Sequence, residues 1–140
     1  MNRPAGFQRR ARRILFFLAA LLLAGGAQAE WILLGRNDAI RFYLDHKSLQ
    51  KNGELTQIVQ LMDFTTAQWV DAQTVVGSLK MLIEYDCATP RSRALASEAY
   101  SEQMAEGKLV SKEQYAEPKW DPVEPGSTPD KIRQIACSKK

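Results

Sequence analysis

The sequence is 140 residues long, is 45% hydrophobic and carries a formal net charge of +3. That length suits one domain with a single hydrophobic core. Five of the 19 basic residues lie in the first 13 positions, and the rest of the chain has 14 basic and 16 acidic residues. Its net charge of −2 argues against nucleic-acid binding, which requires a basic face to neutralise phosphates.

Residues 1–29 have the three-part pattern of a cleaved export signal. Five arginines without an acidic residue precede an apolar run over residues 14–23, and small residues occupy the −3 and −1 positions before the expected cleavage site. The alternative, a retained membrane anchor, requires about 20 apolar residues, which is more than this run provides. We therefore expect cleavage between Ala29 and Glu30 and a mature domain over residues 30–140.

The same segment has two further interpretations, a twin-arginine signal and a lipid-attachment signal. Arg12-Arg13 before an apolar run is compatible with a twin-arginine signal, although extra arginines in an ordinary basic region explain it equally well. Both cysteines, Cys87 and Cys137, lie far from the cleavage site, so lipid attachment there is excluded chemically. The expected product is periplasmic or secreted and is not lipid-anchored at the cleavage site.

The first predicted elements of the mature domain are strands separated by turns. Residues 31–34 form an apolar run that suits a strand buried on both faces. Alternating apolar and polar residues predict a half-buried strand over residues 40–45. Lys-Asn-Gly at 51–53 predicts a tight turn. Residues 55–64 are apolar at both parities, which predicts a central strand.

The next strand, in the segment SLKMLIEYDC, contains the first cysteine. Its alternation places Cys87 on the apolar face and Glu84 and Asp86 on the other. These carboxylates could perform acid–base catalysis, but like-charged residues on a solvated strand face are the commoner arrangement. Arg91 and Arg93 follow on the next strand, and we hypothesise that they pair with the two acids across a hairpin and stabilise the sheet.

The C-terminal part combines short strands, an irregular loop and a helix. Strands are expected over residues 91–101 and 108–111. Residues 117–130 contain four prolines, which exclude regular structure, and we expect this loop to pack on the body. Thr128 as a cap and Pro129 at the first helical position then predict a helix of about ten residues, which is marginal on its own in water.

A disulfide between Cys87 and Cys137 is the simplest anchor for this helix. Ile132, Ile135 and Ala136 form its apolar stripe, and Cys137 lies at the flank of that stripe. Two cysteines in an exported domain favour one crosslink, and a closed loop of about 50 residues is worth roughly 4 kcal/mol. The alternative, a reactive thiol, lacks the CxxC spacing, and the acids before Cys87 disfavour a thiolate.

Other candidate chemistry is sparse, and we predict no catalytic residue, cofactor or metal. His46 could belong to a Ser-His-Asp triad, but no nucleophile-elbow motif accompanies it, so an exposed loop histidine is the simpler interpretation. One histidine and two paired cysteines do not supply a zinc site. Trp31 and Trp120 have apolar neighbours and are expected in the core. Trp69 is the candidate exposed aromatic for partner contact, although it could instead fold back on the body.

Several short motifs recur in one order along the mature chain. They are Trp31 at its start, YLDHKSLQKNG, VQLMDF, SLKMLIEYDC, RSRALASEAYSEQMAEGKLV and the terminal WDPVEPGS…IACS. Together these motifs resemble the surface-adhesin protein E-like domain of exported Gram-negative bacterial proteins. The resemblance covers nearly all of the mature chain.

The resemblance implies an α+β, mainly β fold, with a curved antiparallel sheet of about six strands and a C-terminal helix tied by the disulfide to its concave face. The family's named member is a surface lipoprotein that binds host matrix and plasma proteins, and this sequence departs from it in having no lipid-accepting cysteine. For function, the resemblance implies a non-enzymatic, adhesin-like protein-binding module. The alternatives are an envelope-associated structural factor that binds another bacterial protein, and a small hydrolase that uses His46. A homodimer is compatible with the first two.

Overall fold

The computed structural model describes residues 29–138. The predicted export signal therefore lies, apart from Ala29, outside the described residues. The strands are β1 (Trp31–Arg36), β2 (Ile40–Asn52), β3 (Leu55–Trp69), β4 (Val75–Asp86), β5 (Arg91–Tyr100), β6 (Leu109–Gln114) and the two-residue β7 (Asp121–Pro122). One 3₁₀ turn, η2 (Gln103–Ala105), follows β5, and the helix α2 (Thr128–Cys137) ends the described chain.

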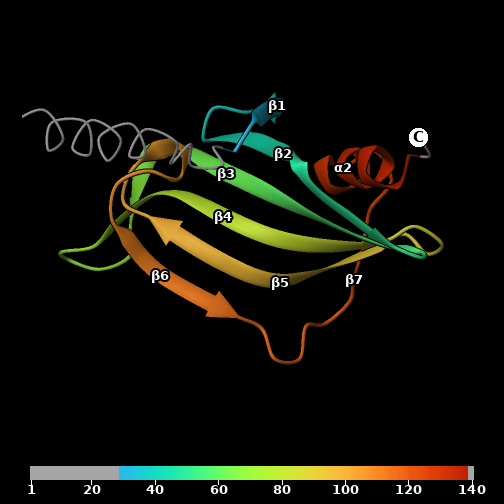
Figure 1. The fold of residues 1–140 in the computed structure, drawn as a ribbon. Coiled ribbons are helices and arrows are strands. Elements are labelled where there is room, and N and C mark those ends of the chain that lie inside the picture. The colour runs from blue at the N-terminus through green and yellow to red at the C-terminus, as the bar shows by residue number, and fades with distance from the viewer. Residues whose placement is uncertain (1–28, 139–140) are drawn as a thin grey trace, which may run out of the picture.

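The strands form one antiparallel sheet in the order β1-β2-β3-β4-β5-β6, with β7 paired to the start of β5. The strands β1 to β6 pair with their neighbours in sequence. Short turns favour this order, such as the one at Gly53, where φ is +60°. Figure 1 shows the sheet curved, with α2 on its concave side. The expected six-stranded curved sheet with a C-terminal helix is thereby confirmed.

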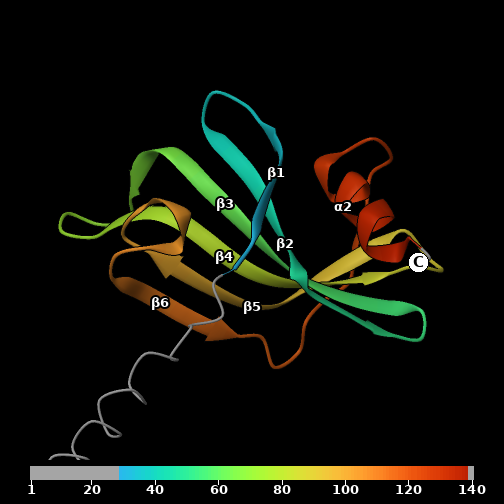
Figure 2. The same ribbon diagram turned by 45° about the horizontal axis from the view of Figure 1, so that its top comes forward.

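The hydrophobic core lies between α2 and the concave face of the sheet. Leu44, Ile58 and Tyr85 project from β2, β3 and β4 and are fully buried beneath Ile132 and Ala136 of the helix. Val123, in the loop before the helix, completes the cluster. This confirms the prediction that the loop packs on the body of the domain. Figure 2 shows α2 over one end of the long strands, with η2 near the other. The helix thus covers only part of the sheet.

The disulfide predicted from the sequence is present. It joins Cys87, directly after β4, to Cys137 at the end of α2, with a Cα–Cα distance of 5.5 Å and a sequence separation of 50. Arg133 adds a second tie, since its Nε donates to the carbonyl of Asp86 at 3.0 Å and its Nη2 to the carbonyl of Cys87 at 3.3 Å. The helix is therefore fixed to the β4–β5 turn by covalent and polar contacts.

Two details of the predicted helix are wrong. The N-cap is Ser127, one residue earlier than expected, and its hydroxyl accepts a hydrogen bond from the backbone N–H of Asp130 at 3.2 Å. Thr128 and Pro129 thus form its first two positions. Ile135, assigned to the apolar stripe, is exposed. Only Ile132 and Ala136 reach the sheet, because they lie four residues apart on one side of the helix.

The prediction that residues 31–34 are buried on both faces is also wrong. Their strand, β1, lies at one edge of the sheet, where Ile32 is 45% and Leu33 is 50% exposed. Trp31 itself is half-buried and does not belong to the core cluster. An apolar run gives no information on whether a strand becomes central or lies at the edge.

Candidate functional site

The two carboxylates of the cysteine-bearing strand are buried, which corrects the prediction of a solvated face. Glu84 and Asp86 are each about 5% exposed. Arg93 Nε donates to Glu84 at 2.6 Å, and Arg91 Nε donates to Asp86 at 2.9 Å. The hypothesised pairs across the β4–β5 hairpin are therefore present. Trp120 covers both arginines, with their Cζ atoms 4.5 and 4.3 Å from its ring centroid, so it is half-buried on these arginines and lies outside the core.

These buried acids have structural partners on every side. Gln57 donates to the second oxygen of Glu84 at 2.9 Å. Hydrogen bonds from the backbone N–H of Thr89, with further contributions from Arg91 and the N–H of Ala88, lower the pKa of Asp86. Hydrogen bonds of this kind favour the charged form of Asp86. Both carboxylates thus take part in ion pairs that join β4 to β5.

A second ion cluster joins β4, β5 and β6. Glu98 accepts from Lys112 Nζ at 2.8 Å and from the Tyr100 hydroxyl at 2.8 Å, and it also pairs with Lys80. The hydrogen bond from Lys112, followed by that from Lys80, lowers the pKa of Glu98 to about 2. This cluster, too, stabilises strand pairing.

The β5–β6 loop, residues 101–108, is anchored to the ends of β3 and β4 by buried polar groups. Asp63 is fully buried; it pairs with Arg41 Nη2 at 2.7 Å and accepts from the backbone N–H of Met104 at 2.7 Å. Ser78 is equally buried; it donates to the carbonyl of Glu102 at 2.6 Å and accepts from the N–H of Ala105 at 2.9 Å. These contacts hold the loop backbone in one place.

The same loop stores backbone strain. Met104 and Ala105 have φ values of +59° and +60°, a left-handed conformation that costs a non-glycine residue free energy. Gly77 of β4 permits the close approach, since a Cβ there would lie 2.5 Å from the backbone carbon of Glu102. The hydrogen bonds to Asp63 and Ser78 offset this cost. Sequence reasoning missed this feature, because neither left-handed residue is a glycine.

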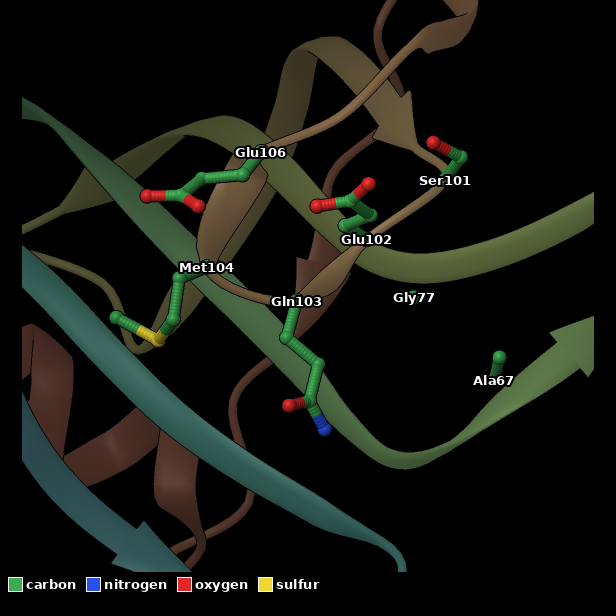
Figure 3. Close-up of a pocket in the computed structure, with 7 residues that line it drawn as sticks. All are labelled: Ala67, Gly77, Ser101, Glu102, Gln103, Met104 and Glu106. Carbon is green, nitrogen blue, oxygen red and sulfur yellow. The ribbon is translucent and has the colours of Figure 1, made fainter.

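A hollow of about 620 Å³ lies between this loop and the β3–β4 hairpin. Figure 3 shows that Glu102, Gln103, Met104 and Glu106 line it from the loop, while Ala67 and Gly77 come from the facing strands. Its lining, with Ser101, contains two carboxylates and no basic residue among the residues that the structure describes.

The β3–β4 hairpin carries the most exposed aromatic side chain of residues 29–138. Trp69 is 69% and Val70 is 60% exposed, so Trp69 does not fold back on the body. A second hollow of about 470 Å³ is lined by Trp69, Val70, Asp71 and Ala72. Figures 1 and 2 both show the hairpin extending away from the end of the sheet opposite α2. The hairpin tip and the hollow lined by Trp69 together form the candidate binding site.

The remaining sequence candidates lie elsewhere. His46 is exposed, but it belongs to β2 and not to a loop, within the irregularity of the β2–β3 register between Asp45 and Gln50. No hydrogen bond joins its side chain to a serine in the part described.

Within residues 29–138, no three His, Cys, Asp or Glu side chains gather closely enough to hold a metal ion. None of the helices described there is long and apolar enough to cross a membrane.

Comparison with protein families and solved structures agrees with the motif resemblance. A family model described as surface-adhesin protein E matches residues 31–138. No curated protein sequence matches the chain. Its fold is similar to crystal form II of Haemophilus influenzae protein E, with a TM-score of 0.64 and 16% identity over 79% of this chain and 88% of that chain.

A structure of protein E from non-typeable Haemophilus influenzae gives a similar result. Its TM-score is 0.61 at 15% identity, over 81% of this chain and 78% of that chain. At such low identity the likeness concerns the fold alone. The family and the architecture expected from the sequence motifs are therefore confirmed.

Proposed function

Since this chain belongs to the surface-adhesin protein E family, we propose that it is an exported, non-enzymatic protein that binds another protein through its β3–β4 hairpin. The observation that carries this proposal is Trp69, which is 69% exposed beside the 60% exposed Val70. Tryptophan is enriched among the residues that dominate interface energies. An exposed apolar tip at the end of the sheet suits a contact with a partner surface.

A binding role is also supported by the state of the polar side chains in the body of the sheet. Glu84, Asp86 and Asp63 are buried, and each is paired with an arginine. Such carboxylates stabilise the fold and are poorly placed to take a proton from a substrate. His46, the candidate of the hydrolase hypothesis, is exposed on β2, and no hydrogen bond within residues 29–138 joins its side chain to a serine.

For location, we propose a periplasmic or secreted protein that is not lipid-anchored at the cleavage site. The sequence has cysteines only at positions 87 and 137, and both form the disulfide, which suits an oxidising compartment. N-terminal sequencing of the exported protein is expected to begin at Glu30. Cell fractionation then distinguishes an adhesin-like role, with a host matrix or plasma protein as partner, from an envelope-associated role with a bacterial partner.

The binding proposal is tested by capturing proteins on the immobilised, disulfide-bonded chain. Plasma and matrix proteins are offered in one arm and a periplasmic extract in the other. We expect a partner in one arm whose capture falls about tenfold or more with Trp69→Ala, the loss typical of a central interface aromatic. The matched control is Leu33→Ala, which removes an exposed apolar side chain from the distant edge strand.

A partner that binds the Trp69→Ala variant as well as the wild type would refute the hairpin as the contact. An enzymatic turnover that is lost with His46→Ala would refute the non-enzymatic role.

A further inference from the structure

Residues 30–140 contain two asparagines, and both lie at turns between strands. Asn37, in the β1–β2 turn, is followed by Asp38, whereas Asn52, at the end of β2, is followed by Gly53. Both asparagines are exposed. Figures 1 and 2 show the β2–β3 turn at the same end of the sheet as α2. Exposure alone therefore does not distinguish the two residues.

The side chain of Asn37 is held by the backbone that follows it. Its Oδ1 accepts hydrogen bonds from the N–H of Ala39 at 2.9 Å and from the N–H of Ile40 at 2.8 Å. The N–H of Asn37 in turn donates to the carbonyl of Ile40 at 3.0 Å. Such hydrogen bonds from an asparagine to the backbone of its own turn fix the direction of the side-chain amide. The Cγ atom of Asn37 is therefore not free to turn toward the next backbone nitrogen.

The side chain of Asn52 has no such constraint. Among residues 29–138, its amide forms no hydrogen bond, and the N–H of Gly53 donates to no acceptor. Gly53 has a φ of +60°, and no atom lies within 4 Å of the Cβ that another residue would add there. Since glycine has no side chain, its nitrogen is unshielded and its peptide group rotates readily. The Cγ atom of Asn52 is thus accessible to the nitrogen of Gly53.

Rotation of this peptide group disturbs little of the sheet. Asn52 pairs with Leu55, and this is the last pair of the β2–β3 ladder before the turn. The ends of ladders open locally at a small cost in free energy, whereas central pairs open only with the whole fold. The geometry needed for attack on Cγ is therefore reached without unfolding the domain.

The reaction that these groups support is the intramolecular loss of the side-chain amide. Hydroxide removes the proton from the backbone nitrogen of Gly53, and the nitrogen attacks Cγ of Asn52. The new C–N bond closes a succinimide ring, the Cγ–Nδ2 bond breaks, and ammonia leaves with a proton taken from water. Water then opens the ring at either carbonyl, which gives aspartate or isoaspartate. No atom is oxidised or reduced, and solvent is the only co-reactant.

We propose that Asn52 is a site of spontaneous deamidation in the folded protein and that Asn37 is not. The modification replaces a neutral amide by a carboxylate at the β2–β3 turn. In its isoaspartate form it also adds one methylene group to the backbone between the two strands. This inference goes beyond the proposed protein-binding function and does not depend on it.

The modified turn contacts both segments that the disulfide joins. Lys51 Nζ donates to the carbonyl of Ser138, directly after α2. The carbonyl of Glu54 accepts a hydrogen bond from the N–H of Cys87 at 2.8 Å. Asn52 lies between these two residues of the turn, so the new negative charge and the longer backbone arise next to the anchored end of the helix.

The test keeps the disulfide-bonded chain at mildly alkaline pH and follows its intact mass and its isoelectric point. Digestion with pepsin then locates the change, because the amide nitrogen does not lose its proton in acid. We expect a gain of about 1 Da and one additional negative charge, confined to the peptide that contains Asn52 and formed faster at higher pH. Asn52→Gln should abolish the shift, because glutamine would have to close a larger ring.

The matched control is Asp38→Gly, which gives Asn37 the same following residue as Asn52 and leaves the acceptor of its two hydrogen bonds in place. We expect Asn37 of this variant to remain intact while Asn52 is converted. Equal rates at the two asparagines would contradict the inference, because the dipeptide sequence alone would then decide. The inference would also be overturned if Asn52 stayed intact in the folded chain and deamidated only in urea, since the hairpin would then protect it.

Discussion

At the scale of single residues, the buried carboxylate of Glu84 depends on Arg93. Their side chains are 6% and 26% exposed, so solvent screens the pair only in part. We expect a double-mutant cycle with Glu84→Ala and Arg93→Ala, measured by urea denaturation, to give a coupling free energy of about 1–3 kcal/mol. The exposed pair of Lys47 and Glu30 is the control and should show no measurable coupling. Equal, near-zero coupling in both pairs would contradict a stabilising role.

Glu98 makes stability depend on pH in the acidic range. Lys112 and then Lys80 lower its pKa to about 2 from the ordinary value of 4.5. Because the folded chain has the lower pKa, this stabilisation is complete above about pH 4.5 and is lost as the pH falls toward 2. The Lys112 side chain is 58% exposed, so screening reduces the effect to about 1 kcal/mol.

The variant Glu98→Gln should lower the free energy of unfolding at pH 7 and flatten its decline between pH 4.5 and 2, as urea denaturation at each pH would show. An unchanged pH profile would mean that other carboxylates cause the acid sensitivity.

Sequence patterns predicted residue contacts better than residue burial. Alternation along two consecutive strands led to the hypothesis that Arg91 and Arg93 pair with Glu84 or Asp86, and the structure has both pairs. It could not predict that these acids are buried, because the side chain that covers the arginines, Trp120, is distant in sequence. The anchor at Asp63 was missed for the same reason, since its partner, the N–H of Met104, lies 41 residues away.

At the scale of elements, the contact between β4 and the β5–β6 loop requires the absence of a side chain at Gly77. We expect Gly77→Ala to lower the free energy of unfolding by about 1–3 kcal/mol, because its Cβ would meet backbone and not a side chain that can move. The control is Gly35→Ala, where no atom lies within 4 Å of the added Cβ and φ is not positive. Thermal unfolding of both variants measures the difference.

The Gly77→Ala variant also tests whether the added methyl group displaces the β5–β6 loop. In Gly77→Ala, the amide protons of Met104 and Ala105 should exchange faster with solvent, because the hydrogen bonds to Asp63 and Ser78 lengthen. Unchanged protection of these amides, together with unchanged stability, would show that the loop accommodates the methyl group.

Element types were predictable where the local signal was strong. Alternation and the Lys-Asn-Gly turn located β2 and β3, and parity in SLKMLIEYDC located β4. Element ends were less predictable: β3 continues to Trp69 instead of ending near residue 64, since pairing with β4 extends it beyond the apolar run. For the candidate site, the sequence indicated the exposed Trp69 but not the loop beside it, whose position depends on buried contacts from other strands.

At the scale of the whole molecule, the sheet is a simple meander that short turns make predictable, whereas the placement of α2 depends on contacts between distant segments. The helix begins beyond β7 and covers Ile58 and Tyr85 on the central strands. Since ten residues of helix are marginally stable alone, its position depends on the disulfide, on Arg133 and on the burial of Ile132. The sequence indicated the cysteine pair and the Ile132 and Ala136 side of the helix, but not the hydrogen bonds of Arg133.

Removing that crosslink should therefore loosen one region and leave the rest of the sheet folded. We expect Cys87→Ala with Cys137→Ala to lower the free energy of unfolding by about 2–5 kcal/mol, out of the roughly 5–15 kcal/mol usual for a domain. Hydrogen exchange should accelerate in α2, while the ladder between β3 and β4 stays protected, because its hydrogen bonds do not involve the helix. Arg133→Ala, which removes only the hydrogen bonds to the carbonyls of Asp86 and Cys87, is the comparison and should cost less. If α2 keeps its protection without the disulfide, apolar packing alone holds it; if the β3–β4 ladder loses protection as well, helix and sheet unfold as one unit.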